Sequence, residues 1–311
     1  MVRGVCRRLV DRVLDIHFQR AREHIRRELD RLAILAAQPR IVQLRSNGSL
    51  PRLREAELRI FSQFGEDGII QYLIHHVPIE EETFIEFGVE NYREANTRFL
   101  LVNNNWRGLI MDGNSTLAST LRDDPLYWRH DLNAVSAFIT AENINGLIEN
   151  AGLRGDIGLL SIDIDGNDYW VWQALTVVSP RIVICEYNSL FGWRHPVAVR
   201  YRQDFNITRA HYSNLFYGAS LSALCHLAKE KGYEFVGSNS AGCNAFFVRG
   251  DLTHDLPRPT VEEGYVRSRF RSSTGEDGGL SFLTGDARIE AIAALKVVDV
   301  VTGRDRRVGE L

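Results

Sequence analysis

The feature that most constrains the fold is an alternation of apolar, strand-like runs with helix-like segments, which begins near residue 60. Most of the earlier runs are continuously apolar, as expected of parallel strands that helices cover on both faces. The alternation therefore predicts a doubly wound, mostly parallel α/β sheet. The predicted strands span residues 83–89, 108–112, 126–131, 158–164, 181–187, 233–238 and 244–250, and the predicted helices span residues 96–104, 132–152, 168–175 and 219–232.

The last two predicted strands differ from the others because only a short turn separates them. Asn239, Ser240 and Gly242 supply turn residues, so an antiparallel hairpin is expected at the end of the sheet. Such an ending is unusual for dinucleotide-binding dehydrogenases and common in S-adenosylmethionine-dependent methyltransferases. A second hairpin is expected near the C-terminus, turning at Thr302 and Gly303.

The 311 residues divide into four predicted parts. Residues 1–38 read as one amphipathic helix, and turn residues in 39–59 predict a linker. Residues 60–250 hold the predicted sheet, and residues 251–311 form an extension. The apolar stripe of the helix comprises Val10, Leu14, Phe18, Ala21, Ile25, Leu29, Leu32 and Ala36.

The other faces of this helix are rich in arginine, which leaves three interpretations open. The helix is an oligomerisation element, a basic helix resting on an anionic membrane surface, or a helix packed on its own core. The first interpretation predicts a homo-oligomer, and the second a protein peripheral to the inner face of the membrane.

Composition indicates a soluble globular protein, with 44% hydrophobic and 25% charged residues. No apolar run approaches the length of a membrane helix, and the N-terminal region lacks the apolar core of a secretory signal, so a cytoplasmic location is expected. The formal net charge of -3 gives no electrostatic case for nucleic acid as a partner. The four cysteines form no C-x-x-C pair, so neither a zinc site nor a disulfide framework is predicted.

Ligands of open α/β sheets bind beyond the carboxyl ends of the strands, so the residues there are candidates for a site. The first strand ends in Glu86, which could hold a cationic amine, and Gly88, which permits close approach of the backbone. Asp112, at the end of the second strand, is placed to accept ribose hydroxyls, and Asp131, after the third, to contact an adenine amino group. The chain has no G-x-G-x-x-G cradle for a dinucleotide here.

The segment LLSIDIDGNDYWVW places three carboxylates after the fourth strand. Because a carboxylate is tolerable in a covered sheet only at the open end of a strand, Asp163 and Asp165 are expected at the mouth of the site. Asp168 is expected to cap the helix that follows. Glu186, at the end of the fifth strand, is expected across from Asp163.

Neighbouring carboxylates raise one another's pKa, which leaves two kinds of site open. One is a divalent metal held by Asp163 and Glu186, with Asn188 or Asp165 as a further ligand. The other is a carboxylate poised as a general base, for which the loop residue His195 is a further candidate.

Several blocks, in this order, resemble the FkbM-type S-adenosylmethionine-dependent methyltransferases. The resemblance covers roughly residues 60–250 and implies a Rossmann-like class I methyltransferase that binds S-adenosylmethionine and methylates a hydroxyl of a sugar, nucleotide sugar, glycan precursor or natural product. By position it implies Gln63, Glu66 and Asp67 near the cofactor, Glu86, Gly88, Asn96 and Thr97 on its methionine side, and Asp112 at its ribose. The blocks are FSQFGEDGI (61–69), FIEFGVENYREANTRFLLVNNNWRGLIMDGN (84–114), LLSIDIDGNDYWVWQAL (159–175), VICEYN (183–188) and YGASLSALCHLAKEKGYEFVGSNSAGCNAFFVR (217–249).

Two other classes of function remain as alternatives. An NAD-dependent sugar-modifying enzyme is disfavoured by the missing glycine fingerprint, and a non-catalytic Rossmann-fold scaffold by the density of polar residues at strand ends. The aromatic and basic loop 189–217 could bind a sugar ring by stacking and a phosphate by its arginines.

Overall fold

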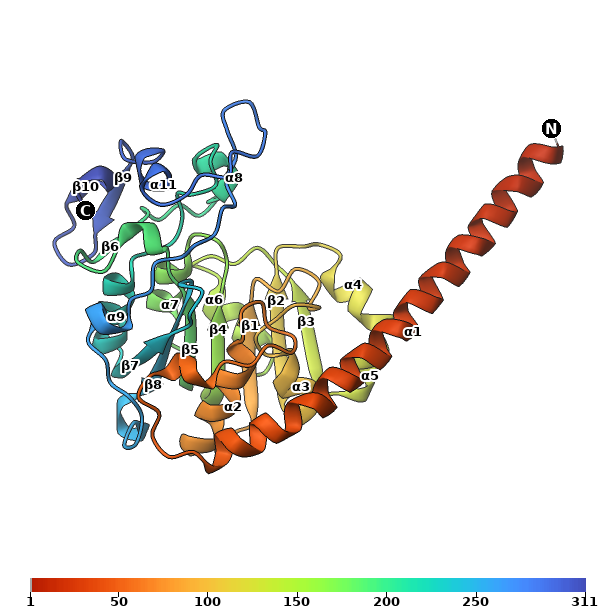
Figure 1. Cartoon of the computed structure of the whole chain (residues 1–311), viewed down its shortest axis with the longest axis horizontal. Coiled ribbons are helices and arrows are strands. Elements are labelled where there is room, and N and C mark those ends of the chain that lie inside the picture. Colours follow the sequence, from red (N-terminus) through yellow and green to blue (C-terminus); the bar gives the residue numbers. More distant parts are fainter. Residues whose placement is uncertain (1) are drawn as a thin grey trace.

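A computed structural model describes residues 2–311, with the side chains of residues 17, 18 and 21–311. Its main sheet has seven strands in the order β3-β2-β1-β4-β5-β8-β7 (Figure 1). Strand β8 is antiparallel to both of its neighbours, and the remaining pairs are parallel. The predicted fold class and terminal hairpin are confirmed. The strands are β1 (Thr83–Phe87), β2 (Arg107–Asp112), β3 (Leu132–Ser136), β4 (Gly155–Ile162), β5 (Val178–Glu186), β7 (Tyr233–Ser238) and β8 (Asn244–Arg249).

Helices cover both faces of the sheet, which makes its central strands apolar on both sides. One core packs α2 and α3 against the sheet, with Tyr72 and Leu100 fully buried. The other packs α6, α7 and α9 against the opposite face, with Trp172 and Leu224 buried. The helices besides α1 are α2 (Glu66–His76), α3 (Arg98–Asn104), α4 (Leu117–Arg122), α5 (Pro125–Arg129), α6 (Ile144–Asn150), α7 (Asp168–Ala174), α8 (Ile207–Ala210), α9 (Leu221–Glu230), α10 (Val261–Gly264) and α11 (Asp286–Glu290).

The third strand was predicted one element too early in the chain. Most of the predicted strand 126–131 lies in α5, which ends at Arg129, because the Asp124 side chain accepts a hydrogen bond from the Leu126 amide (2.8 Å) and Pro125 occupies the first turn. The true β3 follows, within the segment predicted as the start of helix 132–152. Asp131 therefore lies at the amino end of its strand, away from the edge where it was expected.

Helix α1 (Val2–Ser46) is longer than the predicted 1–38 and runs through Pro39. A proline inside a helix leaves the carbonyl four residues earlier without its hydrogen bond. Here that carbonyl belongs to Leu35, which is exposed, so water can satisfy it. The predicted linker consequently begins later, after Ser46.

The C-terminal half of α1 packs on the body through residues that the predicted stripe did not contain. Ala37, Ile41 and Leu44 are buried and share one face of the helix. The predicted stripe lies on another face and is exposed, while its members Val10 and Leu14 lie outside the described side chains. Within residues 2–311, no helix has both the length and the apolarity needed to cross a membrane.

A small three-stranded sheet combines β6 (Val197–Ala198) with the C-terminal strands β9 (Lys296–Asp299) and β10 (Asp305–Arg307). The predicted C-terminal hairpin is confirmed, and Gly303 adopts a φ of 71° in its turn. This sheet has its own apolar core and stands at the end of the molecule to which the carboxyl ends of the parallel strands point (Figure 1).

Candidate active site

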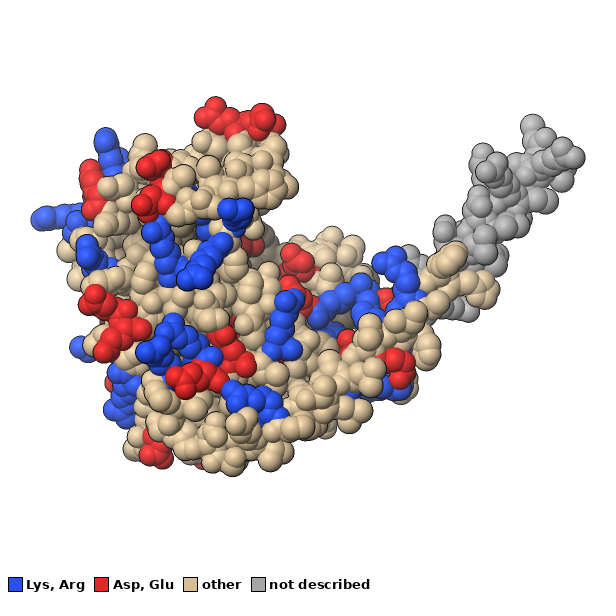
Figure 2. Space-filling view, in the orientation of Figure 1, with Lys and Arg blue, Asp and Glu red and all other residues tan. Residues whose placement is uncertain are grey.

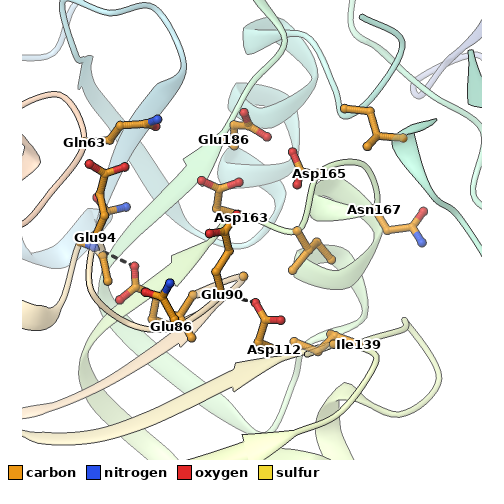
Figure 3. Close-up of a pocket in the computed structure, with 18 of the residues that line it drawn as sticks. Gln63, Glu86, Glu90, Glu94, Asp112, Ile139, Asp163, Asp165, Asn167 and Glu186 are labelled. Atoms are coloured by element: carbon orange, nitrogen blue, oxygen red, sulfur yellow. Dashed lines mark hydrogen bonds between the residues drawn. The ribbon is translucent and has the colours of Figure 1, made fainter. Parts of the chain in front are cut away.

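A cavity of about 750 Å³ opens at the carboxyl edge of β1, β2, β4 and β5 (Figure 3). This is the edge at which parallel α/β sheets bind their ligands. Most of the residues that the sequence nominated line it, and they come from five separate segments of the chain. The predicted residues in its lining are Gln63, Glu86, Gly88, Asn96, Asp112, Asp163, Asp165 and Glu186.

Gly88 joins two of these segments by allowing close contact between their backbones. It has a φ of 75°, and a Cβ atom there would lie 1.4 Å from the carbonyl oxygen of Asp163. Any side chain would therefore separate the turn after β1 from the turn after β4.

Glu86 is held by the residues that begin α3. Its carboxylate accepts hydrogen bonds from the backbone amides of Asn96 (2.8 Å) and Thr97 (3.0 Å) and from the Thr97 hydroxyl (2.5 Å). Burial nevertheless raises the pKa of Glu86 to about 7. Thr97 is fully buried and positions Glu86 from outside the cavity lining.

Asp112 lies at the end of β2 and organises the turn that follows β1. One of its oxygens accepts a hydrogen bond from the Glu90 amide (2.7 Å), and the other from the Asn114 amide (2.6 Å). A carboxylate fixed in this way retains further acceptor positions for the hydroxyls of a ligand.

The carboxylates after β4 and β5 converge as predicted. The parallel register pairs Ile162 with Cys185, which brings the next residues, Asp163 and Glu186, side by side. One oxygen each from Asp163, Glu186 and Asp165 lie within 4.8 Å of one another. Oxygen Oε2 of Glu186 is buried and has no hydrogen-bond partner among the described residues.

Electrostatics in this group disfavour full ionisation. Burial, followed by repulsion from Asp165 and Asp168, raises the pKa of Asp163 well above its ordinary value. Burial and the neighbouring carboxylates have the same effect on the pKa of Glu186. Asp165 is an exposed residue, but the surrounding protein still partly desolvates its carboxylate, which raises its pKa. Three such carboxylates need a shared proton or a cation.

Asp168 has a structural role that differs from the predicted one. Its two oxygens accept hydrogen bonds from the Ile164 (2.8 Å) and Gly166 (2.9 Å) amides, so it closes the turn that precedes α7 and does not cap that helix. The turn includes Asp165, which has a φ of 54°. Asp168 thus holds Asp165 in a left-handed conformation at the cavity.

Glu66 and Asp67, predicted near the cofactor, are buried beneath the loop that carries Gln63 and are absent from the cavity lining. Glu66 accepts hydrogen bonds of 2.6 and 2.9 Å from two side-chain amides at the β7–β8 hairpin. Asp67 accepts bonds from the three backbone amides of residues 60–62. Both residues fix the loop, and only Gln63 reaches the cavity.

Three further nominated residues lie away from the cavity. The Asp131 carboxylate is exposed at the amino end of β3, 3.5 Å from Arg107. The Asn188 side chain bonds to backbone groups of Leu190, Leu215 and Tyr217, which excludes it from the metal group. His195 precedes β6 and does not line the cavity, so it is not placed to act as the base.

Sequence reasoning missed lining residues that come from the correct β3 and from the loop after β5. Phe138 and Ile139 follow β3, and Phe138 is exposed to 55% at the cavity. Phe205, Asn206 and Ile207 line it from the side of the small sheet. The Asp124-Pro125 helix start was the signal that would have placed β3 correctly and identified the first two.

The cavity lining is strongly acidic. Arg93 is its one Lys or Arg side chain among the described lining residues, against seven carboxylates. Such a surface attracts cationic ligands and repels diphosphates. The carboxylates are Glu86, Glu90, Glu94, Asp112, Asp163, Asp165 and Glu186.

Comparisons with solved structures find distant likeness to several proteins. No protein-family model and no curated protein matches the sequence. The N-terminal domain of EvdMO1, solved in the presence of SAH and D-fucose, aligns with a TM-score of 0.40 and 12% identity over 72% of this chain and 96% of that one. An S-adenosylmethionine-dependent methyltransferase from Clostridium acetobutylicum aligns with a TM-score of 0.38 and 9% identity over 60% of this chain and 90% of that one.

The CurJ carbon methyltransferase aligns with a TM-score of 0.38 and 9% identity over 58% of this chain. The chain spans about half of its length, 52%. Alignments this distant assign no function.

Proposed function

We propose that this chain is an S-adenosylmethionine-dependent methyltransferase that transfers a methyl group to a hydroxyl. The observation that carries the proposal is the acidic cavity at the carboxyl edge of a sheet whose β8 is antiparallel. S-adenosylmethionine carries a sulfonium and an ammonium group and no phosphate, so it suits seven carboxylates, whereas the diphosphate of NAD does not. Placement in the FkbM-type family rests on the sequence blocks alone.

The β1–β2 side of the cavity, together with the residues that follow β3, is the proposed cofactor side. Asp112 would accept the ribose hydroxyls, and Phe138 and Ile139 would contact the adenine. Glu86, at the end of β1, and Gln63, which Figure 3 shows on the side of the cavity away from Asp112, would face the methionine portion.

The β4–β5 side is the proposed reaction side. The acceptor oxygen attacks the methyl carbon, the carbon–sulfur bond breaks with its electron pair going to sulfur, and S-adenosylhomocysteine leaves. The hydroxyl proton must go to a base, and the Asp163 carboxylate, beside Glu186, is proposed to accept it. The raised pKa of Asp163 makes it a stronger base than an ordinary aspartate.

A divalent cation that prefers oxygen ligands also fits this side. Asp163, Asp165 and Glu186 would hold it, and the unpartnered Glu186 Oε2 is an acceptor that such an ion would satisfy. When bound, the cation would lower the pKa of the acceptor hydroxyl.

For the acceptor we propose a sugar, glycan precursor or natural product whose reacting part carries no phosphate. Phe205 and Asn206 offer an apolar ring and an amide on the reaction side. Two arginines of loop 189–217 are engaged in ion pairs, since Arg200 pairs with Asp305 (2.6 Å) and Arg202 with Asp204 (3.2 Å).

Mass spectrometry with S-adenosylmethionine carrying a deuterated methyl group tests the proposal. A panel of sugars, nucleotide sugars and glycan precursors is incubated with the chain and with the Asp163→Asn variant. The expected result is a labelled methyl ether that forms with the chain and not with the variant. A label on carbon or nitrogen would contradict transfer to a hydroxyl, and equal product from the variant would contradict the assignment of the base.

A further inference from the structure

Helix α1 exposes an apolar stripe that packs on nothing in the part of the chain that the structure describes. The spacings of seven, four and three residues between its large members place them on one helical face. The face that packs on the body is the separate one formed by Ala37, Ile41 and Leu44. The exposed members are Phe18 (66%), Ile25 (58%), Leu29 (59%) and Leu32 (61%).

A hollow of about 410 Å³ lies between this stripe and the loop that follows β1. Ile25 and Leu29 form its apolar part, and Arg22, Arg26 and Arg93 its cationic part. Its one carboxylate, from Glu23, bonds to Arg26 and to Arg93, whose Nη2 lies 3.1 Å away.

The hollow therefore keeps a net positive charge beside exposed apolar side chains. Arg22 is exposed and has no carboxylate partner among the described residues. Figure 2 shows Lys and Arg side chains, interspersed with Asp and Glu, near α1 and on the adjoining face of the molecule. Apolar side chains next to cationic ones match the interface of a bilayer that contains anionic lipids.

We propose that α1 is a docking surface for an anionic lipid bilayer, with the stripe entering the interface and the arginines of the hollow contacting the headgroups. Charge decides between this occupant and a second copy of the chain. A second copy would bring the same arginines against these, whereas anionic headgroups neutralise them.

This surface is continuous with the candidate active site, because Arg93 lines both the hollow and the active-site cavity. A bilayer bound to α1 would lie at the rim of that cavity. Docking would therefore bring the site to acceptors held at a membrane. The stripe and Arg22 lie outside the cavity, so membrane binding stands whether or not the chain transfers methyl groups.

Co-sedimentation of the full chain with vesicles tests the proposal. Binding is compared on phosphatidylcholine alone and on phosphatidylcholine with about one third phosphatidylglycerol, and the mixed vesicles are expected to bind more strongly. The double variant Ile25→Ser, Leu29→Ser should weaken that binding by at least about tenfold, because it removes buried apolar groups. Arg22→Gln should weaken it about fivefold.

Val42→Ser is the control, because Val42 is exposed to 61%, much as Ile25 (58%) and Leu29 (59%) are, but lies outside the stripe and the hollow. Unchanged binding by this control supports the proposal, and a loss equal to that of the double variant overturns it. Equal binding to both vesicles would also overturn it. The proposal would also be overturned if the unaltered chain did not bind vesicles and instead formed dimers, measured by sedimentation velocity, and the double variant did not form them.

Discussion

The two sides of the active-site cavity satisfy their carboxylates in different ways. On the β1–β2 side, Glu86 and Asp112 accept hydrogen bonds from backbone amides of the neighbouring turns. On the β4–β5 side, Asp163 and Glu186 lie among other carboxylates, and one buried oxygen of Glu186 has no partner within the described chain. The first side is complete without a ligand, and the second needs a proton or a cation.

This contrast suggests a division of work. Hydrogen-bonded carboxylates hold a fixed geometry, which suits the recognition of a cofactor. Carboxylates that lie among other carboxylates, with one buried oxygen left without a partner in the described chain, can take up a proton, which suits acceptor activation. Variants on the two sides should therefore separate cofactor binding from methyl transfer.

The largest effect is expected from Asp163→Asn. Methyl transfer should fall by at least about a hundredfold, because the amide of asparagine cannot take up the proton of the substrate hydroxyl. Affinity for S-adenosylhomocysteine, measured by calorimetry, should change by less than about threefold, since the β1–β2 side is intact. Asp165→Asn in the same turn is the control and should lower transfer far less. A comparable loss of S-adenosylhomocysteine affinity in Asp163→Asn would argue against the division.

Asp112→Ala should have the converse effect. Affinity for S-adenosylhomocysteine should fall by about ten- to a hundredfold, as expected for the loss of a charged acceptor of ribose hydroxyls. Asp131→Ala provides the comparison, because Asp131 lies at the amino end of its strand, away from the cavity. This variant should bind S-adenosylhomocysteine as tightly as the unaltered chain does. Equal losses in both variants would place the ribose elsewhere.

The pH dependence of stability should report Glu86. Its pKa is about 7 in the folded chain, above the ordinary value of 4.5, so the folded state holds this proton more tightly than the unfolded state. Its contribution is fully present below about pH 4.5 and is lost as the pH rises through 7, for a total of about 3 kcal/mol. Urea denaturation should therefore show a shallower decline between these pH values for Glu86→Gln. Glu90→Gln, at an exposed residue of the next turn, should keep the full decline.

The smallest effect is expected from a divalent cation. Saturating Mn²⁺ should raise the midpoint of thermal unfolding by about 2–4 °C, because it neutralises the three carboxylates after β4 and β5. Glu186→Gln should reduce this shift, and Glu94→Gln, in the same cavity but outside the trio, should retain it. If Mn²⁺ did not raise the unfolding midpoint of the unaltered chain, the cation site would be contradicted. A shared proton would then account for the three neighbouring carboxylates.

Sequence patterns predicted well the parts of the site that depend on one strand and its turn. Glu86, Asp112, Asp163 and Glu186 all lie at or directly after the carboxyl ends of apolar strands, and the order of the parallel strands brings them to one edge. The role of Asp168 was missed because turn closure and helix capping use the same residue type at the same position.

Features that depend on contacts between distant segments were harder to predict. His195 lies in a loop whose position is set by pairing of β6 with the C-terminal β9, which no local pattern shows. The two faces of α1 are both apolar, so periodicity alone could not tell which one packs on the body. Adenine contacts were assigned to Asp131 because a short capped helix was read as a strand.

Calorimetric titration of the chain with S-adenosylhomocysteine and with NAD tests the central claim most directly. The two ligands share an adenosine, and they differ in the diphosphate that the acidic cavity should repel. Saturable binding of S-adenosylhomocysteine, with no binding of NAD at the same concentrations, is the predicted result. Binding of NAD without binding of S-adenosylhomocysteine would contradict the account.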